Sequence, residues 1–143
     1  SKTEKIEREI EMIKKGILNP AVNNALSKMT HLDTMLVSDA AMPLPKGVER
    51  VDLAFTLGIP PLVPVIEGIL EECIIEKVYI ANEIEKASPA LLEEYRKLFG
   101  DIPIELIPHE KLCEMSENSR VCLRTGENRF HYSSVLLVCG CPY

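Results

Sequence analysis

Residues 31–45 read HLDTMLVSDAAMPLP, and this stretch organises the interpretation of the whole chain. The apolar run at 34–38 predicts a short buried strand. Titratable side chains stand at both of its ends: His31 and Asp33 precede it, and Asp39 follows it and leads into a loop of small residues and proline. Because ligands of α/β proteins usually lie beyond the carboxyl ends of the strands, Asp39 marks a candidate binding site.

Strand-like and helix-like patterns alternate along the rest of the chain, with helix-start signals at Asn19-Pro20 and Ser88-Pro89. This alternation predicts an α/β fold: a single three-layer domain with a central, largely parallel but mixed sheet flanked by helices. The last two strands have only a loop between them, so we expect them to pair antiparallel. We expect helices at about 3–17, 19–29, 62–73, 90–99 and 109–116, and strands at 34–38, 51–55, 77–81, 104–107, 120–124 and 134–139.

The composition excludes several classes of function. The 143 residues carry a formal net charge of -6, which argues against a nucleic-acid surface and against adhesion to anionic membranes. The sequence has no apolar run near the roughly 20 residues of a membrane span, and its start is polar, so we expect a cytoplasmic protein. The glycine-rich signatures of nucleotide-binding loops are absent from the sequence.

The cysteines are odd in number, and none shows C-x-x-C spacing. We therefore expect reduced, buried thiols, since the C-x-C pair near the end is only a weak metal signal. The five are Cys73, Cys113, Cys122, Cys139 and Cys141.

His31 and Asp33 suggest acid/base chemistry. A carboxylate two residues from a histidine could accept a hydrogen bond from the imidazole, fix its tautomer and favour its protonated form. Such a histidine is a suitable general acid. The alternative is a surface histidine that is stabilised by the dipole at a helix C-terminus. For Asp39 the alternatives are binding sugar hydroxyls and capping a turn.

Three further positions carry chemically useful side chains. His109 opens a short helix after a proline, and it is either a ligand group or a helix-start residue. Tyr132 combines an apolar ring with a hydroxyl, which suits a sugar pocket and equally a partly buried core position. Glu127 is either a turn residue or a second acid.

Several pieces of sequence, in a fixed order from about residue 15 to 140, match a known pattern. They are GILN at 16–19, HLD at 31–33, SDAAMPLP at 38–45, RVDLAFT at 50–56 with GIP at 58–60, ANEI at 81–84, HE at 109–110, and RTGE at 124–127 followed by Tyr132. With these pieces the chain resembles the D-ribose pyranase and L-fucose mutarotase family, and it is closer to the ribose branch.

The resemblance implies an isomerase that interconverts the pyranose and furanose forms, and the anomers, of a free monosaccharide such as D-ribose. It implies no metal and no cofactor, and a homo-oligomer of two stacked pentamers, a decamer, with the site between neighbouring subunits. It also marks residues 1–14 as a helical extension before the usual family start.

The resemblance assigns roles to six residues of this chain. His31 takes the position of the catalytic histidine and Asp33 that of its partner acid. The substrate-binding positions fall on Asp39, His109, Tyr132 and Ser134.

The chain departs from the family pattern at a few of these positions: Thr30, Leu32 and Ala41 are unusual, and Ser134 replaces an asparagine. A serine lacks the paired donor and acceptor of an asparagine amide. The alternatives are therefore a mutarotase for another sugar such as L-fucose, or a non-catalytic, transport-associated sugar-binding subunit.

Overall fold

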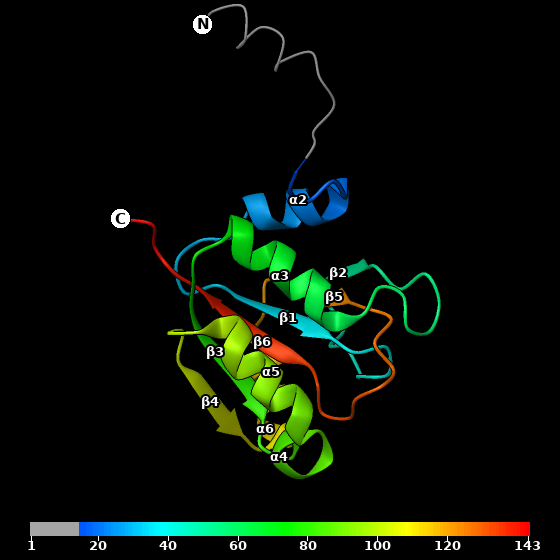
Figure 1. The fold of residues 1–143 in the computed structure, drawn as a ribbon. Coiled ribbons are helices and arrows are strands. Elements are labelled where there is room, and N and C mark those ends of the chain that lie inside the picture. Colours follow the sequence, from blue (N-terminus) through cyan, green and yellow to red (C-terminus); the bar gives the residue numbers. More distant parts are fainter. Residues whose placement is uncertain (1–14) are drawn as a thin grey trace, which may run out of the picture.

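The computed structural model describes residues 15–143, which form one six-stranded sheet with helices on both faces (Figure 1). The helices are α2 (Pro20–Ser27), α3 (Leu62–Glu72), α4 (Ile84–Ala87), α5 (Pro89–Phe99) and α6 (His109–Ser116). The strands are β1 (Thr34–Ser38), β2 (Glu49–Asp52), β3 (Ile75–Ala81), β4 (Ile104–Ile107), β5 (Val121–Arg124) and β6 (Val135–Cys139).

The strands lie in the order β2-β5-β1-β6-β3-β4. Strand β1 runs parallel to β5 and antiparallel to β6, while β3 runs antiparallel to β6 and parallel to β4. Since β2 is also parallel to β5, β6 is the antiparallel member of an otherwise parallel sheet. This arrangement confirms the predicted largely parallel, mixed α/β sheet.

The predicted pairing of the last two strands is wrong. Strands β5 and β6 lie on opposite sides of β1 rather than beside each other. Residues 125–134 connect them, and this connection is long enough to carry the chain past β1. Strand β1 is buried along residues 35–38 and pairs with a strand at each edge, which gives its buried backbone groups hydrogen-bond partners on both sides.

The two faces of the sheet bury different sets of side chains because successive strand residues point to opposite sides. On one face, Met35 and Val37 join the larger core cluster with residues of α2, α3 and α5. On the other face, Leu36 belongs to a smaller cluster with Leu112 of α6. The sheet therefore forms the middle of three layers, and Figure 1 shows α3 and α5 crossing the near face.

Most element boundaries agree with the expected ranges. The side chain of Asn19 accepts a hydrogen bond from the backbone N–H of Val22, as expected for a helix cap. Strand β1 has the predicted bounds, whereas β2 begins two residues earlier than expected and the short helix α4 was not anticipated. Of the helix predicted at 3–17, residues 3–14 lie outside the described residues, and 15–17 are not helical.

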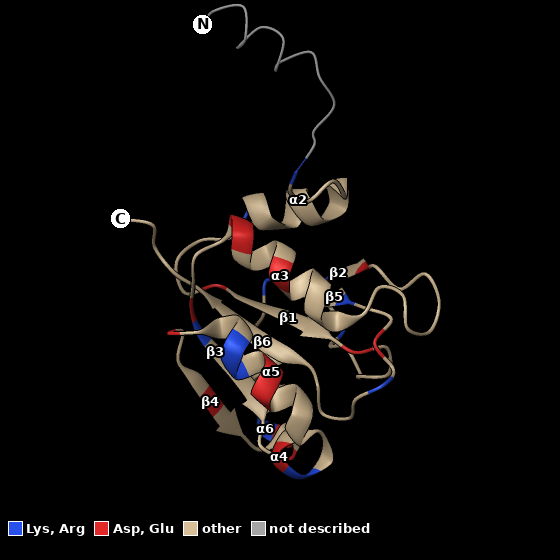
Figure 2. Ribbon diagram, in the orientation of Figure 1, with Lys and Arg blue, Asp and Glu red and all other residues tan. Residues whose placement is uncertain are grey.

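Charged residues are dispersed over the described structure. Figure 2 shows Lys and Arg positions scattered among Asp and Glu positions rather than gathered on one element. No helix within residues 15–143 is long and apolar enough to cross a lipid bilayer.

Candidate functional site

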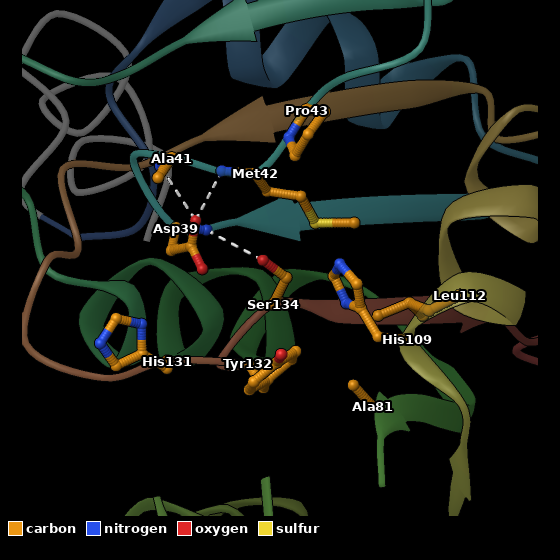
Figure 3. Close-up of a pocket in the computed structure, with 10 residues that line it drawn as sticks. All are labelled: Asp39, Ala41, Met42, Pro43, Ala81, His109, Leu112, His131, Tyr132 and Ser134. Carbon is orange, nitrogen blue, oxygen red and sulfur yellow. Dashed lines mark hydrogen bonds between the residues drawn. The ribbon is translucent and has the colours of Figure 1, made fainter. Parts of the chain in front are cut away.

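Asp39 follows directly after β1, where its carboxylate both shapes a turn and faces a cavity. Oxygen Oδ1 accepts hydrogen bonds from the backbone N–H groups of Ala41, at 3.0 Å, and Met42, at 2.7 Å. The Ser133 hydroxyl lies 3.4 Å from the other oxygen, Oδ2, which points toward the pocket in Figure 3. Both alternatives for Asp39, turn cap and ligand-facing acid, are therefore compatible with one geometry.

His109 enters the same cavity from the first turn of α6. Its backbone N–H is held by the Glu83 carboxylate, with N···O distances of 3.0 and 3.3 Å. Its Nε2 lies 3.5 Å from the sulfur of Cys113, one helical turn further on. Burial and the nearby carboxylates, Glu110 foremost, raise the pKa of the Cys113 thiol, which therefore stays protonated at neutral pH.

The other ring nitrogen of His109 has no partner. Within the described residues, Nδ1 is the buried side-chain nitrogen or oxygen that lacks a hydrogen bond. A buried polar atom without a partner is costly in a folded protein. A ligand hydroxyl in the cavity would remove that cost.

Tyr132 stands opposite His109, with the ring centroids 5.2 Å apart and the planes nearly perpendicular at 82°. The loop that carries it is fixed from both sides. The Ser88 hydroxyl donates to the carbonyl of His131, and the buried Tyr95 hydroxyl donates to the carbonyl of Ser133 at 2.6 Å. The Tyr132 ring is therefore presented by a rigid support.

These side chains enclose a cavity of about 210 Å³ (Figure 3). It is smaller than the cavities of about 300–1,000 Å³ that hold drug-sized ligands, so it suits a small polar molecule. Four of the predicted site residues line it, together with an apolar wall and His131, which sequence reasoning did not select. The lining residues are Asp39, Ala41, Met42, Pro43, Ala81, His109, Leu112, His131, Tyr132 and Ser134.

The segment Arg124-Thr125-Gly126-Glu127 fixes the carboxyl end of β1 rather than entering the cavity. The Thr125 hydroxyl donates to the Ser38 carbonyl at 2.7 Å, and the Arg124 guanidinium donates to the Ala40 carbonyl. A side chain at Gly126 would collide with the backbone of residues 56–59, so this loop approaches its neighbour closely. Of the alternatives for Glu127, the structure supports a structural role.

Glu127 is buried, and its two oxygens are both used. Oε1 accepts from the backbone N–H of Leu62 at 3.2 Å, and Oε2 accepts from the backbone and the guanidinium of Arg129. Burial alone would raise the pKa of Glu127, but these hydrogen bonds outweigh it and lower the pKa below the usual 4.5. The carboxylate therefore joins the start of α3 to the loop after β5.

His31 and Asp33 lie at the opposite end of β1. Asp33 accepts hydrogen bonds from the backbone N–H and the hydroxyl of Thr30, and its carboxylate also pairs with Arg120 at 3.3 Å. The Thr30 backbone N–H, followed by the Thr30 hydroxyl and then the Arg120 guanidinium, holds the pKa of Asp33 below its usual value. The predicted hydrogen bond between Asp33 and the His31 imidazole is wrong. Instead, Nε2 of His31 lies 3.2 Å from a carboxylate oxygen of Glu76.

The two ends of β1 are too far apart for direct contact between their side chains. Five strand residues alone span roughly 15 Å at about 3.3 Å per residue. His31 borders a second hollow of about 420 Å³ on its own side, lined by residues of the α2–β1 loop, α3 and the chain end. Within one copy of the chain, His31 is therefore not part of the cavity that contains Asp39.

Backbone strain marks both ends. Within residues 15–143, the non-glycine residues with positive φ are Leu32, at 73°, and Tyr132, at 58°. Such residues cost free energy and tend to cluster where function requires a particular geometry. One is the neighbour of His31, and the other lines the cavity.

Known proteins share this architecture and sequence. The RbsD / FucU transport protein family matches residues 12–142. The D-ribose pyranase 1 of Rubrobacter xylanophilus is 43% identical over 129 residues, which cover 90% of this chain and 97% of the relative. The chain belongs to the RbsD/FucU family. A D-ribose pyranase of Streptomyces avermitilis is similar at 42% identity, with 90% of this chain and 98% of that protein covered.

Solved RbsD/FucU structures agree with the fold. The structure of Bacillus subtilis RbsD complexed with D-ribose superposes with a TM-score of 0.87 at 30% identity, covering 92% of this chain and all of that one. The fucose mutarotase of Streptococcus pneumoniae in complex with L-fucose has a TM-score of 0.78 at 18% identity, covering 92% of this chain and all of that one. The second likeness bears on the fold alone.

Sequence reasoning missed three residues near these groups: His131, Cys113 and Glu76. The first two stand beside a selected residue, since His131 precedes Tyr132 and Cys113 follows His109 by one helical turn, a spacing that could have identified it. Glu76 is 45 residues from His31, and no local signal connects them.

Within residues 15–143, no group of three or more His, Cys, Asp or Glu side chains is arranged to hold a metal ion. The five cysteines are free thiols, of which only Cys122 and Cys139 are buried as expected.

Proposed function

We propose that this chain is an isomerase that interconverts the ring forms of free D-ribose, pyranose with furanose and one anomer with the other. The observation that carries the proposal is the small cavity after β1, which is lined by the polar side chains of Asp39, His109, Tyr132 and Ser134. The relatives named D-ribose pyranase, at up to 43% identity over 90% of the chain, point to the same chemistry.

Each polar group of the cavity suits a sugar hydroxyl. The Oδ2 oxygen of Asp39 accepts a hydrogen bond from a hydroxyl, and hydrogen bonds to ionised carboxylates are strong. Nδ1 of His109 gains its missing partner, and the Tyr132 hydroxyl supplies a donor and an acceptor beside an apolar ring. The Ser134 hydroxyl accepts from the Asp39 backbone N–H at 3.1 Å, which leaves its own proton for the ligand.

The acid/base comes from a second copy of the chain. His31 cannot reach the cavity of its own copy, because β1 separates them. A head-to-tail contact would place the His31 end of one copy on the Asp39 end of the next, and repetition of such a contact closes a ring. Large exposed apolar side chains accompany both ends: Leu32, 63% exposed, lies beside His31, and Phe55, 86% exposed, belongs to the loop that packs on Gly126. We therefore propose that the complete enzyme is a homo-oligomer, and the family resemblance implies two stacked rings of five copies, a decamer.

The reaction needs only proton transfers. Removing the proton of the anomeric hydroxyl and delivering one to the ring oxygen breaks the bond between C1 and that oxygen and leaves an open-chain aldehyde. Attack of a different hydroxyl, or attack on the other face, reverses both transfers, so no atom or electron is gained or lost. His31 takes and returns the proton, Asp33 holds the turn that carries it, and the cavity residues position the sugar. A general acid/base of this kind accelerates a reaction about 10²–10⁴-fold.

The experiment is ring exchange of D-ribose measured by NMR saturation transfer, with and without the protein. We expect the wild-type chain to accelerate exchange and His31→Ala to lose that acceleration while it still binds ribose. A wild-type chain that binds ribose without changing its exchange rates would instead be a non-catalytic sugar-binding subunit. A panel of free aldoses that includes L-fucose tests the substrate, and faster exchange of another sugar would overturn the assignment to ribose.

A further inference from the structure

We propose that Glu76 is the positioning residue of His31: it holds the proton on Nε2 and leaves Nδ1 to exchange protons with the sugar. The inference rests on the proposed function, since it takes His31 as the acid/base. It replaces the role expected for Asp33, whose carboxylate is occupied by Thr30 and Arg120.

The contact between the two side chains is direct. Nε2 of His31 and Oε2 of Glu76 lie 3.2 Å apart, within hydrogen-bond distance. Glu72, which lines the hollow beside His31, is engaged elsewhere, because its Oε1 accepts from the backbone N–H of Ile17 at 2.8 Å. Glu76 is thus the carboxylate that the described structure places against the ring.

A β-bulge aims Glu76 at the histidine. Strand β3 pairs Ile75 with Cys139 and Lys77 with Val138, so Glu76 is the extra residue of β3 and has no partner on β6. Bulges of this kind bend a strand and redirect a side chain, and they are frequent next to active sites. The register shift falls at the one position of β3 that contacts His31.

The residue facing Glu76 is a glycine, and the reason is space. A Cβ at Gly140 would lie 3.3 Å from Cβ of Glu76, 3.5 Å from its Oε2 and 2.9 Å from a methyl carbon of Ile74. The backbone of Gly140 does not have the positive φ that would by itself favour glycine. The missing side chain therefore avoids a clash with Ile74 and a tight contact with Cβ of Glu76, which lets the backbone of Gly140 approach the bulge closely.

The chemistry follows from which nitrogen is bound. A carboxylate that accepts a hydrogen bond from Nε2 fixes the neutral tautomer with its proton there. The lone pair of Nδ1 then takes the proton of the anomeric hydroxyl, and Glu76 stabilises the imidazolium that results. The same proton leaves Nδ1 for the ring oxygen, so the histidine ends each cycle in its starting form.

The decisive variant is Glu76→Gln in the full chain, with Glu105→Gln as the matched control. Glu105 is also an exposed strand carboxylate in a surface ion pair, 2.8 Å from Lys77, but it lies at the outer strand of the sheet. Two readouts are needed: kcat and KM for ribose exchange, and the ¹⁵N chemical shifts of the His31 ring. The shifts are accessible by histidine-selective labelling because the chain has only three histidines.

We expect Glu76→Gln to lower kcat at least about tenfold and to leave KM within about twofold. The loss in kcat should be smaller than the loss on removing the general acid/base itself. The His31 ¹⁵N shifts should show the proton redistributed between Nδ1 and Nε2, whereas Glu105→Gln should change neither readout. Gly140→Ala, which crowds Ile74 and Cβ of Glu76 and so displaces Glu76 without removing its carboxylate, should alter both in the same direction.

Two results would overturn the proposal. One is unchanged His31 shifts, or kcat within twofold of wild type, in Glu76→Gln. The other is an Asp33→Asn variant that moves the ring proton while Glu76→Gln does not. Failure of the proposed function is distinguishable, because full acceleration by His31→Ala would remove His31 from the mechanism whatever the ¹⁵N shifts show.

Discussion

The two ends of β1 are built differently. Asp39 follows the carboxyl end, and His31 precedes the amino end. At the carboxyl end, Asp39 lines a partly open cavity whose loops are fixed by buried hydrogen bonds from Tyr95 and Thr125. At the amino end, His31 and Glu76 are about half exposed, at 53% and 40% of their side-chain surface. The first end is a pocket with fixed walls, and the second is an exposed surface.

This difference supports the proposal that the catalytic site combines the two ends from different copies. A binding pocket needs rigid walls, which the core of the same copy supplies. A proton-transfer group needs only to be presented at the right place, and a neighbouring copy can do this. The three predictions below test whether the ends have these separate roles, in order of decreasing effect.

The largest contrast is between Asp39→Ala and Asp33→Ala. Asp39→Ala removes the acceptor for two backbone N–H groups and for a sugar hydroxyl, and hydrogen bonds to charged groups contribute about 1.5–3 kcal/mol. We expect ribose affinity to fall about 10- to 100-fold. Asp33→Ala should change affinity less than threefold and act on kcat instead. Isothermal titration calorimetry measures the affinities, and equal losses in both variants would remove the distinction between the ends.

Glu127→Gln tests how much the rigid end depends on its buried carboxylate. The variant weakens the bonds to Leu62 and Arg129, so the free energy of unfolding should fall by about 1–3 kcal/mol. The fold lowers the pKa of Glu127, so the ionised carboxylate adds to the free energy of unfolding. This contribution to stability is fully present above pH 4.5, the usual pKa, and is lost as the pH falls through the lowered pKa.

The difference in stability between wild type and Glu127→Gln should therefore narrow as the pH drops below about 4.5. Urea unfolding at several pH values measures it. Asp33→Asn, at the exposed end, should cost less at neutral pH, since exposed ion pairs contribute only about 0–1 kcal/mol. If Asp33→Asn lost more unfolding free energy than Glu127→Gln, the carboxyl end of β1 would not be the more rigid one.

The smallest effect is expected for Cys113→Leu, which removes the sulfur 3.5 Å from Nε2 of His109. The ring then loses a weak partner that fixes its orientation, and we expect ribose to bind about two- to fivefold more weakly, the equivalent of a fraction of a neutral hydrogen bond. Cys122→Ser is the matched control, because Cys122 lies on β5 beside Ser119 and outside the cavity. Equal changes in both variants would mean that the thiol of Cys113 does not act through His109.

Local patterns predicted the elements well and the long-range contacts poorly. The apolar run and its flanking acids fixed β1 at residues 34–38, because a buried strand bounded by polar residues has a strong local signature. The position of β6 between β1 and β3 depends on contacts between distant residues, which no local pattern reveals.

In the candidate site, too, residues with a local sequence signal were predicted and long-range contacts were not. Asp39, His109, Tyr132 and Ser134 were named from sequence and line one cavity. Asp33 was expected to bind His31 because it is near in sequence, but a tight turn engages it with Thr30 instead. The contact with Glu76 arises from a bulge in β3, and a bulge is visible only once two strands are paired.

The central claim is that the catalytic site combines the Asp39 end of one copy with the His31 end of another. It is tested most directly by mixing two variants after unfolding and joint refolding: His31→Ala, which lacks the acid/base, and Asp39→Asn, which binds ribose weakly. Exchange is measured well below the ribose concentration that saturates Asp39→Asn. Asp39→Asn keeps an oxygen for the turn and removes the charge that binds the sugar. We predict that about a quarter of the sites in random mixed rings combine an intact His31 with an intact Asp39, so that ribose exchange returns to about a quarter of the wild-type rate. No recovery of exchange in rings shown to contain both variants would contradict the account.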